Sequence, residues 1–185
     1  GSELTGKKFL KASQNFIYNS KMDYGSLIEI SRSRERMEKD LANEITKGKN
    51  VKLGYGALAD IEFAVQVLQL MNGGKNFRLR STNTLEAIFQ FGSQSLIDPH
   101  ELRMLKNNYR FLRNLECSLR LFSTFFGNHL PKDQETLQEL AKFLSYNTKT
   151  NYDSAEKLMQ TYHQKTDEVR LFYQKTIGTL LRTSI

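Results

Sequence analysis

The chain has 185 residues, of which 39% are hydrophobic and 25% are charged, values typical of a soluble globular protein. This length predicts a single domain with its own core over residues 3–185, after Gly1 and Ser2, which we expect to be a cloning remnant. No apolar run approaches the roughly 20 residues of a membrane span, and no signal peptide is visible. The one cysteine, Cys117, cannot form an internal disulfide. We therefore expect a cytoplasmic protein with no membrane segment.

The formal net charge of +7 favours an acidic partner, such as a nucleotide, a nucleic acid or an acidic protein surface. The excess positive charge is spread along the chain and forms no basic tail. Apolar residues recur at helical spacing throughout, and the alternating pattern typical of strands is absent.

Two helices are predicted before residue 50. Residues 6–19 place one set of small and apolar side chains on one side: Phe9, Ala12, Ser13, Phe16 and Ile17. Residues 24–47 carry an apolar stripe of Leu27, Ile30, Met37, Leu41 and Ile45. The charged residues between them are expected to form a solvated face, and they are Arg32, Arg34, Glu35, Arg36, Glu38, Lys39 and Asp40.

The most distinctive stretch is residues 51–74, where a glycine-bearing turn leads into a strongly apolar helix. A helix that is apolar nearly all round is expected to be buried. Gly73 and Gly74 follow it and are suited to ending it. Its polar exceptions Glu62, Gln66 and Gln69 share one face. Asp60 lies in the first turn, where the helix dipole favours a carboxylate.

Capping signals mark the later helices. Asn83 with Glu86 predicts a short helix that ends at Gly92, and Asp98 with Pro99 predicts a long one that runs to about residue 126. Pro131 is expected to start a shorter helix. Residues 145–151 are polar and loop-like, and Asp153 is expected to cap a last long helix. The sequence therefore predicts an all-α antiparallel bundle of about seven helices, several of them long.

The motif KLG-x-G-x-x-x-DIEF-x-VQ-x-LQL-x-x-GG occupies residues 52–74. It resembles the helical domain that follows each nucleotidyltransferase domain in bacterial glutamine synthetase adenylyltransferases. The uridylyltransferase of the PII nitrogen-signalling protein is a more distant relative of that family. The resemblance extends on both sides. It includes FIY at 16–18 and DYGSL at 23–27 before the motif, and LRS at 79–81, TLEA at 84–87, YRFLRNLE at 109–116 and HLP at 129–131 after it, and it covers roughly residues 9–177.

This resemblance implies a helical domain of an enzyme that moves AMP from ATP onto a tyrosine of glutamine synthetase, or removes it by phosphorolysis. The implied partners are an adjacent nucleotidyltransferase domain and glutamine synthetase, with PII as a regulatory partner. ATP and Mg²⁺ are expected for the intact enzyme only. The family holds Mg²⁺ with an Asp-x-Asp pair after a Gly-Ser turn, but no two aspartates here are separated by a single residue. We therefore expect no cofactor and no catalytic domain in this chain.

The glycine-bearing turn has two interpretations. It could be a tight chain reversal that lets the helix pack closely. Alternatively, free amides at the start of a helix could face a nucleotide or a protein partner. The residues that would face this ligand are Lys52, Gly54, Tyr55, Gly56, Asp60, Glu62 and Gln66.

The long helix after Pro99 carries five basic residues on one face: Arg103, Lys106, Arg110, Arg113 and Arg120. They are either a solvated face or a docking surface for an acidic protein. A nucleic-acid partner is not expected, since no aromatic residues interleave on this face to stack on bases. Glu116 falls in the core stripe of this helix and needs a partner. We expect a structural ion pair with Arg80, Lys52 or Arg120.

Two alternatives stay open at this point. The chain could be a helical domain of the PII-uridylyltransferase type, or a non-enzymatic helical adaptor that binds an acidic partner through its basic face. The three histidines lack ligand spacing, so no metal site is predicted.

Overall fold

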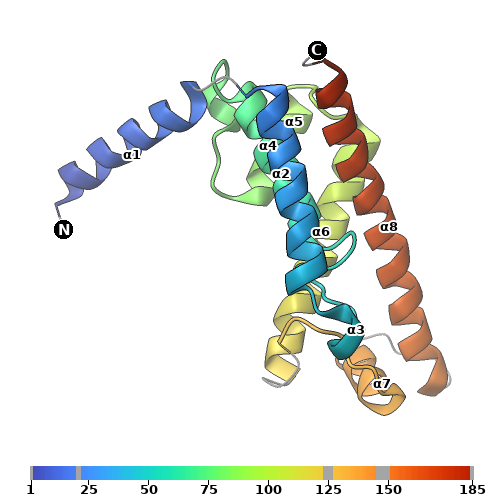
Figure 1. The fold of residues 1–185 in the computed structure, drawn as a ribbon. Helices are drawn as coiled ribbons and strands as arrows, with labels where there is room; N and C mark the ends of the chain where they lie inside the picture. The colour runs from blue at the N-terminus through green and yellow to red at the C-terminus, as the bar shows by residue number, and fades with distance from the viewer. Residues whose placement is uncertain (1, 20–21, 123–126, 145–150, 184–185) are drawn as a thin grey trace.

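The computed structural model describes residues 2–19, 22–122, 127–144 and 151–183 (Figure 1). The predicted all-α fold is confirmed. The helices are α1 (Glu3–Asn19), α2 (Tyr24–Arg36), α3 (Glu44–Lys47), α4 (Leu58–Asn72), α5 (Thr84–Ser93), α6 (Pro99–Phe122), α7 (Gln134–Phe143) and α8 (Asn151–Thr183). A π-helical turn, Met37–Leu41, extends α2, and a 3₁₀ turn, Phe77–Leu79, follows α4. Within the described part of the chain, the extended pairing is limited to an isolated bridge between Asn50 and His129.

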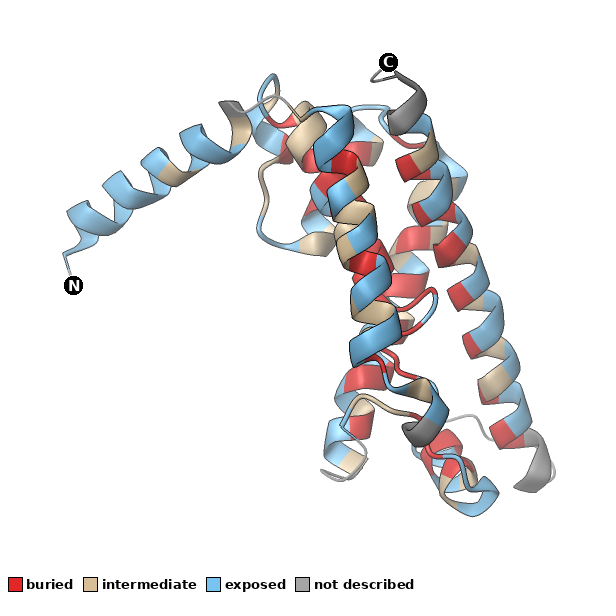
Figure 2. Ribbon diagram, in the orientation of Figure 1, coloured by how far each residue is buried: buried red, intermediate tan, exposed pale blue. Residues whose placement is uncertain are grey.

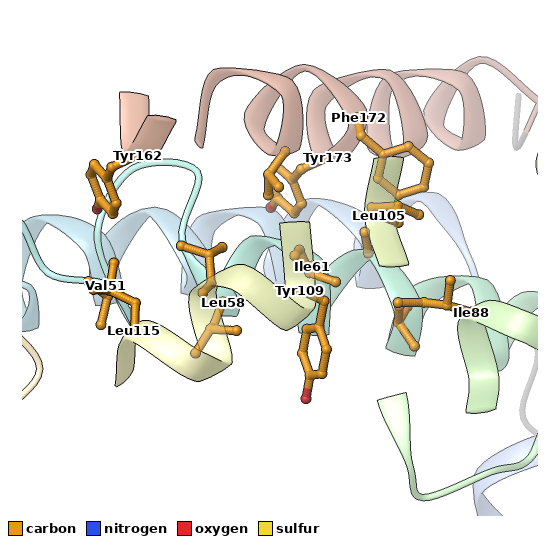
Figure 3. Packing of buried hydrophobic residues seen from close by; sticks show 14 of the residues in the cluster. Val51, Leu58, Ile61, Ile88, Leu105, Tyr109, Leu115, Tyr162, Phe172 and Tyr173 are labelled. Atoms are coloured by element: carbon orange, nitrogen blue, oxygen red, sulfur yellow. The ribbon is translucent and has the colours of Figure 1, made fainter. Parts of the chain in front are cut away.

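Helix α4 is the centre of the bundle, as its apolar composition predicts. It packs against α2, α5, α6 and α8. Its buried residues include Leu58, Ala59 and Val67, which lie on different sides of the helix at about 100° per residue. Figure 2 shows that the buried residues of α8 lie along the side that faces the other helices of the bundle. In Figure 3, Tyr162, Phe172 and Tyr173 of α8 cover one side of this core.

Helix α1 extends away from the bundle (Figure 1). Its apolar side chains are exposed: Phe9 is 70% and Phe16 84% accessible to solvent. The helical periodicity of residues 6–19 is therefore correct, but the apolar side does not enter the core of this chain.

The continuous helix predicted over residues 24–47 is wrong. It breaks after the π-helical turn, where Asn43 adopts a left-handed conformation with φ 52°. The last two residues of the predicted stripe, Leu41 and Ile45, are exposed. The predicted solvated face is also wrong in two places, because Arg34 is fully buried and Glu38 is partly buried.

Side-chain caps explain where α5 and α6 begin. The side chain of Asn83 accepts a hydrogen bond from the amide of Glu86, and α5 ends at Ser93, one residue beyond the predicted Gly92. Asp98 Oδ1 accepts from the amides of His100 and Glu101, so α6 begins at Pro99 as predicted. The predicted end of α6 near residue 126 lies outside the described residues.

The starts of α7 and α8 differ from the prediction. Helix α7 begins at Gln134, not at Pro131, because Asp133 caps it by accepting a hydrogen bond from the amide of Thr136. Helix α8 is already helical at Asn151, so Asp153 is not its N-cap. Most of the predicted polar loop, residues 145–150, lies outside the described residues.

Candidate functional site

The turn before α4 is fixed by Asn50 and by close contact with α8. Asn50 Oδ1 accepts hydrogen bonds from the amides of Lys52 and Leu53, at 3.0 and 2.9 Å. Gly56 has φ +62°, and a Cβ built there would lie 1.9 Å from the carbonyl oxygen of Thr166 in α8. Only glycine fits both the conformation and the space. The geometry supports a tight chain reversal that packs backbone against backbone.

A cluster of four charged residues lies directly beneath this turn. We call Arg34, Glu38, Asp60 and Arg170 the buried charge cluster. Asp60 Oδ1 lies 2.6 Å from Arg34 Nε, and Asp60 Oδ2 lies 3.1 Å from Arg170 Nε. The amide of Gly56 also donates to Asp60 Oδ2, at 3.1 Å. Asp60 therefore joins two buried guanidinium groups, in addition to its place in the first turn of α4.

Glu38 completes the buried charge cluster, since it forms ion pairs with both Arg34 and Arg170. Two positive and two negative charges then balance. Arg34 Nη2 also donates to the carbonyl of Gly54, at 2.7 Å. The cluster therefore ties together α2, its π-helical extension, the turn, α4 and α8.

Burial and pairing act in opposite directions in this cluster. Burial raises the pKa of the Asp60 carboxyl, and the charges of Arg34 and Arg170 oppose that effect. Burial lowers the pKa of Arg170, but Asp60 and Glu38 outweigh it and raise this pKa. The Tyr55 ring lies against Arg170, whose guanidinium carbon is 4.5 Å from the ring centre. Its neighbour Arg170 is thus shielded from solvent.

Sequence reasoning missed Arg34 and Arg170, although one signal was present. Arg34 lies seven residues after Leu27 and four after Ile30, so it occupies the apolar stripe of α2. A charged residue at such a position requires a buried partner. The sequence does not show that the partners come from α4 and α8.

A second group of charges lies where α4 meets α6. Glu116 is only 2% exposed, and it pairs with Arg113 Nη1 at 2.6 Å and with Arg120 Nη2 at 2.9 Å. Arg120 is one of its three predicted partners, whereas Arg80 donates to the carbonyl of Gly73. The third, Lys52, acts electrostatically on Glu62.

Glu62 joins this second group, because its Oε1 lies 4.0 Å from Arg113 Nη2. We call Lys52, Glu62, Arg113, Glu116 and Arg120 the α4–α6 surface cluster. Burial raises the pKa of Glu62, against the opposing charges of Arg113 and Lys52. The hydrogen bond with Glu116 raises the pKa of Arg113, and burial opposes it.

The seven residues predicted to face a ligand therefore fall into two sets. Lys52 and Glu62 belong to the α4–α6 surface cluster, and Gln66 is exposed one turn further along α4. The others belong to the side that faces α2 and α8, and they are Gly54, Tyr55, Gly56 and Asp60. The predicted polar face of Glu62, Gln66 and Gln69 is not exposed along its whole length. Gln69 is buried, and its amide donates to the carbonyls of Leu79 and Ser81.

The predicted basic face of α6 is not uniform. Arg103 lines a groove of about 510 Å³ between α6 and α8, together with Lys165 and Lys175. Lys106 is partly buried and Arg110 is exposed. Arg113 and Arg120 are neutralised in part by Glu116. The face therefore presents less free positive charge than the sequence pattern indicates.

Within the described residues, no three His, Cys, Asp or Glu side chains come close enough to hold a metal ion. The donors that Mg²⁺ requires are thus not gathered in this part of the chain, and no residue here is assigned to it. None of the described helices is both long and apolar enough to cross a membrane.

Comparison with known proteins identifies one family and several relatives. Residues 28–177 match the family described as GlnD PII-uridylyltransferase. The bifunctional glutamine synthetase adenylyltransferase/adenylyl-removing enzyme of Hahella chejuensis is 30% identical over 141 residues, which are 76% of this chain and 14% of that protein. The enzyme of the same description from Mycobacterium tuberculosis (strain ATCC 25618 / H37Rv) is 28% identical and covers 100% of this chain, but the match is 19% of that protein. The chain thus spans less than a fifth of the length of these relatives.

Proposed function

Because this chain belongs to the GlnD PII-uridylyltransferase family, we propose that it is a helical domain of a glutamine synthetase adenylyltransferase and deadenylylase, and that it is not catalytic on its own. The match over residues 28–177 is the observation that carries this proposal. These residues include every member of the buried charge cluster and of the α4–α6 surface cluster. The names of the relatives supply the reaction.

The domain contributes a rigid surface for the protein substrate in this proposal. The α4–α6 surface cluster lies on two packed helices, and the buried carboxylate of Glu116 orients the exposed guanidinium groups of Arg113 and Arg120. Side chains that are already oriented lose less entropy when they bind a partner. Arg110 and Gln66 are exposed nearby on the same two helices. We assign this surface to contact with glutamine synthetase.

The remaining chemistry belongs to the longer enzyme. We assign ATP and Mg²⁺ to its nucleotidyltransferase domain, because the described residues of this chain offer no carboxylate cluster for the metal. We also propose PII as a regulatory partner and the cytoplasm as the site of action. The single cysteine is compatible with a reducing compartment.

Two measurements on the isolated chain test this function. With labelled ATP, Mg²⁺ and glutamine synthetase, the chain should transfer no label to the synthetase. In a binding assay without nucleotide, it should bind immobilised glutamine synthetase, and Arg110→Glu should weaken this binding. Lys142→Glu is the matched control, since Lys142 is exposed on α7. Transfer of label by the chain alone would overturn the non-catalytic assignment, and absence of binding would overturn the assigned partner.

A further inference from the structure

Near its C-terminal end, helix α1 contacts the bundle through Tyr18. The guanidinium carbon of Arg80 lies 4.6 Å from the ring centre of Tyr18, and Arg80 Nε also donates to the carbonyl of Gly73, at 2.7 Å. A Cβ at Gly73 would lie 2.7 Å from the Tyr18 ring, and one at Gly74 would lie 2.7 Å from the Tyr18 carbonyl oxygen. Tyr18 thus packs closely against Gly73 and Gly74, where a side chain on either glycine would clash with it.

This attachment decides which way the apolar face of α1 points. At about 100° per residue, Tyr18 lies on the side of the helix opposite Phe9. Phe16 lies within about 20° of Phe9, and Ala12 lies between them along the helix. Phe9, Leu10 and Phe16 are 70%, 60% and 84% exposed. With Tyr18 in this position, α1 extends away from the bundle (Figure 1), and its apolar face is exposed.

The chemistry of the face indicates the kind of partner. Lys7 and Lys11 lie on the side of the helix opposite Phe9, so their charges stay in water when the apolar face is covered. Lys8 lies at the edge of the apolar face, one turn before Ala12, where its long side chain can extend into water. The face itself is uncharged, and small side chains at Ala12 and Ser13 separate the rings of Phe9 and Phe16. Two large residues with small ones between them accept a protruding ridge of another helix.

We infer that the apolar face of α1, formed by Phe9, Leu10, Ala12 and Phe16, is the docking surface for an uncharged apolar patch on another folded domain of the longer enzyme. The inference rests on the proposed function, which makes this chain part of that enzyme. The relatives support it, since this chain matches only 14–19% of their length and most of their polypeptide lies outside the match. A large exposed apolar face on a soluble domain is otherwise unfavourable.

Cysteine labelling tests this surface directly. In a Cys117→Ser background, Ala12→Cys reports the apolar face and Lys11→Cys reports the opposite face of the same helix. Both residues are exposed in this chain, so a maleimide should label both at similar rates. In the longer enzyme, labelling of Ala12→Cys should slow by about tenfold or more, while that of Lys11→Cys stays unchanged.

Three outcomes would overturn the inference. The first is equal labelling of both cysteines in the longer enzyme. The second is slower labelling of Ala12→Cys in the isolated chain as the concentration of that chain rises. The third is slower labelling of Ala12→Cys in the isolated chain only when anionic phospholipid vesicles are added. The second would assign the face to another copy of the chain, and the third to a membrane. No synthetase or nucleotide is present. Protection without synthetase binding would therefore retain this inference and reject the assigned substrate.

A substitution supplies an independent readout. Phe16→Ser should leave the melting temperature of the isolated chain unchanged, because the ring contacts mainly solvent there. In the longer enzyme it should increase the labelling of Ala12→Cys. An equal loss of stability in both proteins would show that Phe16 supports the fold of this chain, and would contradict the docking role.

Discussion

Asp60 is the residue on which the buried charge cluster depends. It lies against Arg34 and Arg170 at once, and all three residues are buried. A pair of buried charges contributes little net stability when it is complete, because desolvation offsets the attraction. Loss of one member is costly, since the remaining charges are left without compensation in a medium of low polarity.

We expect Asp60→Ala to lower the free energy of unfolding by about 3–5 kcal/mol, because it leaves two buried guanidinium groups with only Glu38. Urea denaturation monitored by circular dichroism measures this loss. Asp40→Ala is the control, because Asp40 is exposed on the same part of the chain as Glu38. Similar small losses for both variants would contradict the central position of Asp60.

Lys52 tests the α4–α6 surface cluster without disturbing the core. In the longer enzyme we expect Lys52→Ala to reduce kcat/KM for adenylylation of glutamine synthetase by about tenfold, or about 1.4 kcal/mol of transition-state stabilisation. The melting temperature should not change, since Lys52 is only partly buried. Lys142→Ala should leave the kinetics unchanged. Normal kinetics for Lys52→Ala would show that the turn does not contribute to the surface that binds glutamine synthetase. Tyr55 is less suitable for this test, because its ring covers Arg170.

At the scale of elements, the contact between the turn and α8 depends on Gly56. A methyl group there meets the backbone of Thr166, and a left-handed conformation adds a further cost for any other residue. Gly127 has a similar φ of +58°, but among the described residues, its chain neighbours aside, no atom lies within 4 Å of the position its Cβ would take. The two glycines therefore separate steric from conformational effects.

We expect Gly127→Ala to cost about 1 kcal/mol, the conformational part alone. Gly56→Ala should cost at least about 2 kcal/mol more, because α8 must move away from the turn. Chemical denaturation of both variants gives the difference. Equal costs would mean that α8 does not approach the turn as closely as described.

The cap of α7 gives a pH-dependent expectation. The hydroxyl and amide of Thr136 donate to Asp133 and lower its pKa below the ordinary value of 3.8. A lowered pKa in the folded state means that the ionised cap stabilises α7 above about pH 4, and that this contribution is lost as the pH falls through the lowered value. The melting temperature of the natural chain should exceed that of Asp133→Asn at pH 6, and the gap should shrink below pH 4. A constant gap between pH 6 and pH 2.5 would contradict this.

The elements that sequence reasoning located well are those with local signals. Asn83 and Asp98 mark helix starts because their partners are the next few amides, and α4 is recognisably buried because its own residues are apolar. The break at Asn43 and the burial of Arg34 have causes far away in sequence. His129, for example, contacts both the carbonyl of Ala42 and the side chain of Asn50, and Arg34 is paired by Asp60. Such partners cannot be inferred from periodicity.

Across the whole molecule, local stability should differ between α1 and the bundle, because α1 makes far fewer contacts than the helices of the bundle. Helix α4 packs against four other helices, whereas α1 is held by Tyr18. An isolated helix of this length is marginal in water. The amides of α1 should therefore exchange with solvent much faster than those of α4, which open only with the whole fold.

Truncation tests the same contrast. Removal of residues 1–14 should change the free energy of unfolding by less than about 0.5 kcal/mol, because these residues contact mainly solvent. Removal of residues 1–18 should cost about 1 kcal/mol more, since it also removes Tyr18 from Arg80 and the glycine pair. Hydrogen exchange and thermal unfolding of both forms provide the measurements. A large loss for the shorter truncation would show that α1 supports the bundle along its length.

The balanced charges of Arg34, Glu38, Asp60 and Arg170 also constrain how this sequence can change during evolution. Any single replacement by an apolar residue passes through a poorly stable intermediate, whereas replacement of the whole set by well-packed apolar residues can be neutral or stabilising. Effects at these four positions are therefore strongly non-additive. Across descendants of this chain the four positions should be inherited or exchanged together, although they lie in segments far apart in sequence. Covariation of these four positions would reflect their ion pairs, which join residues from different helices.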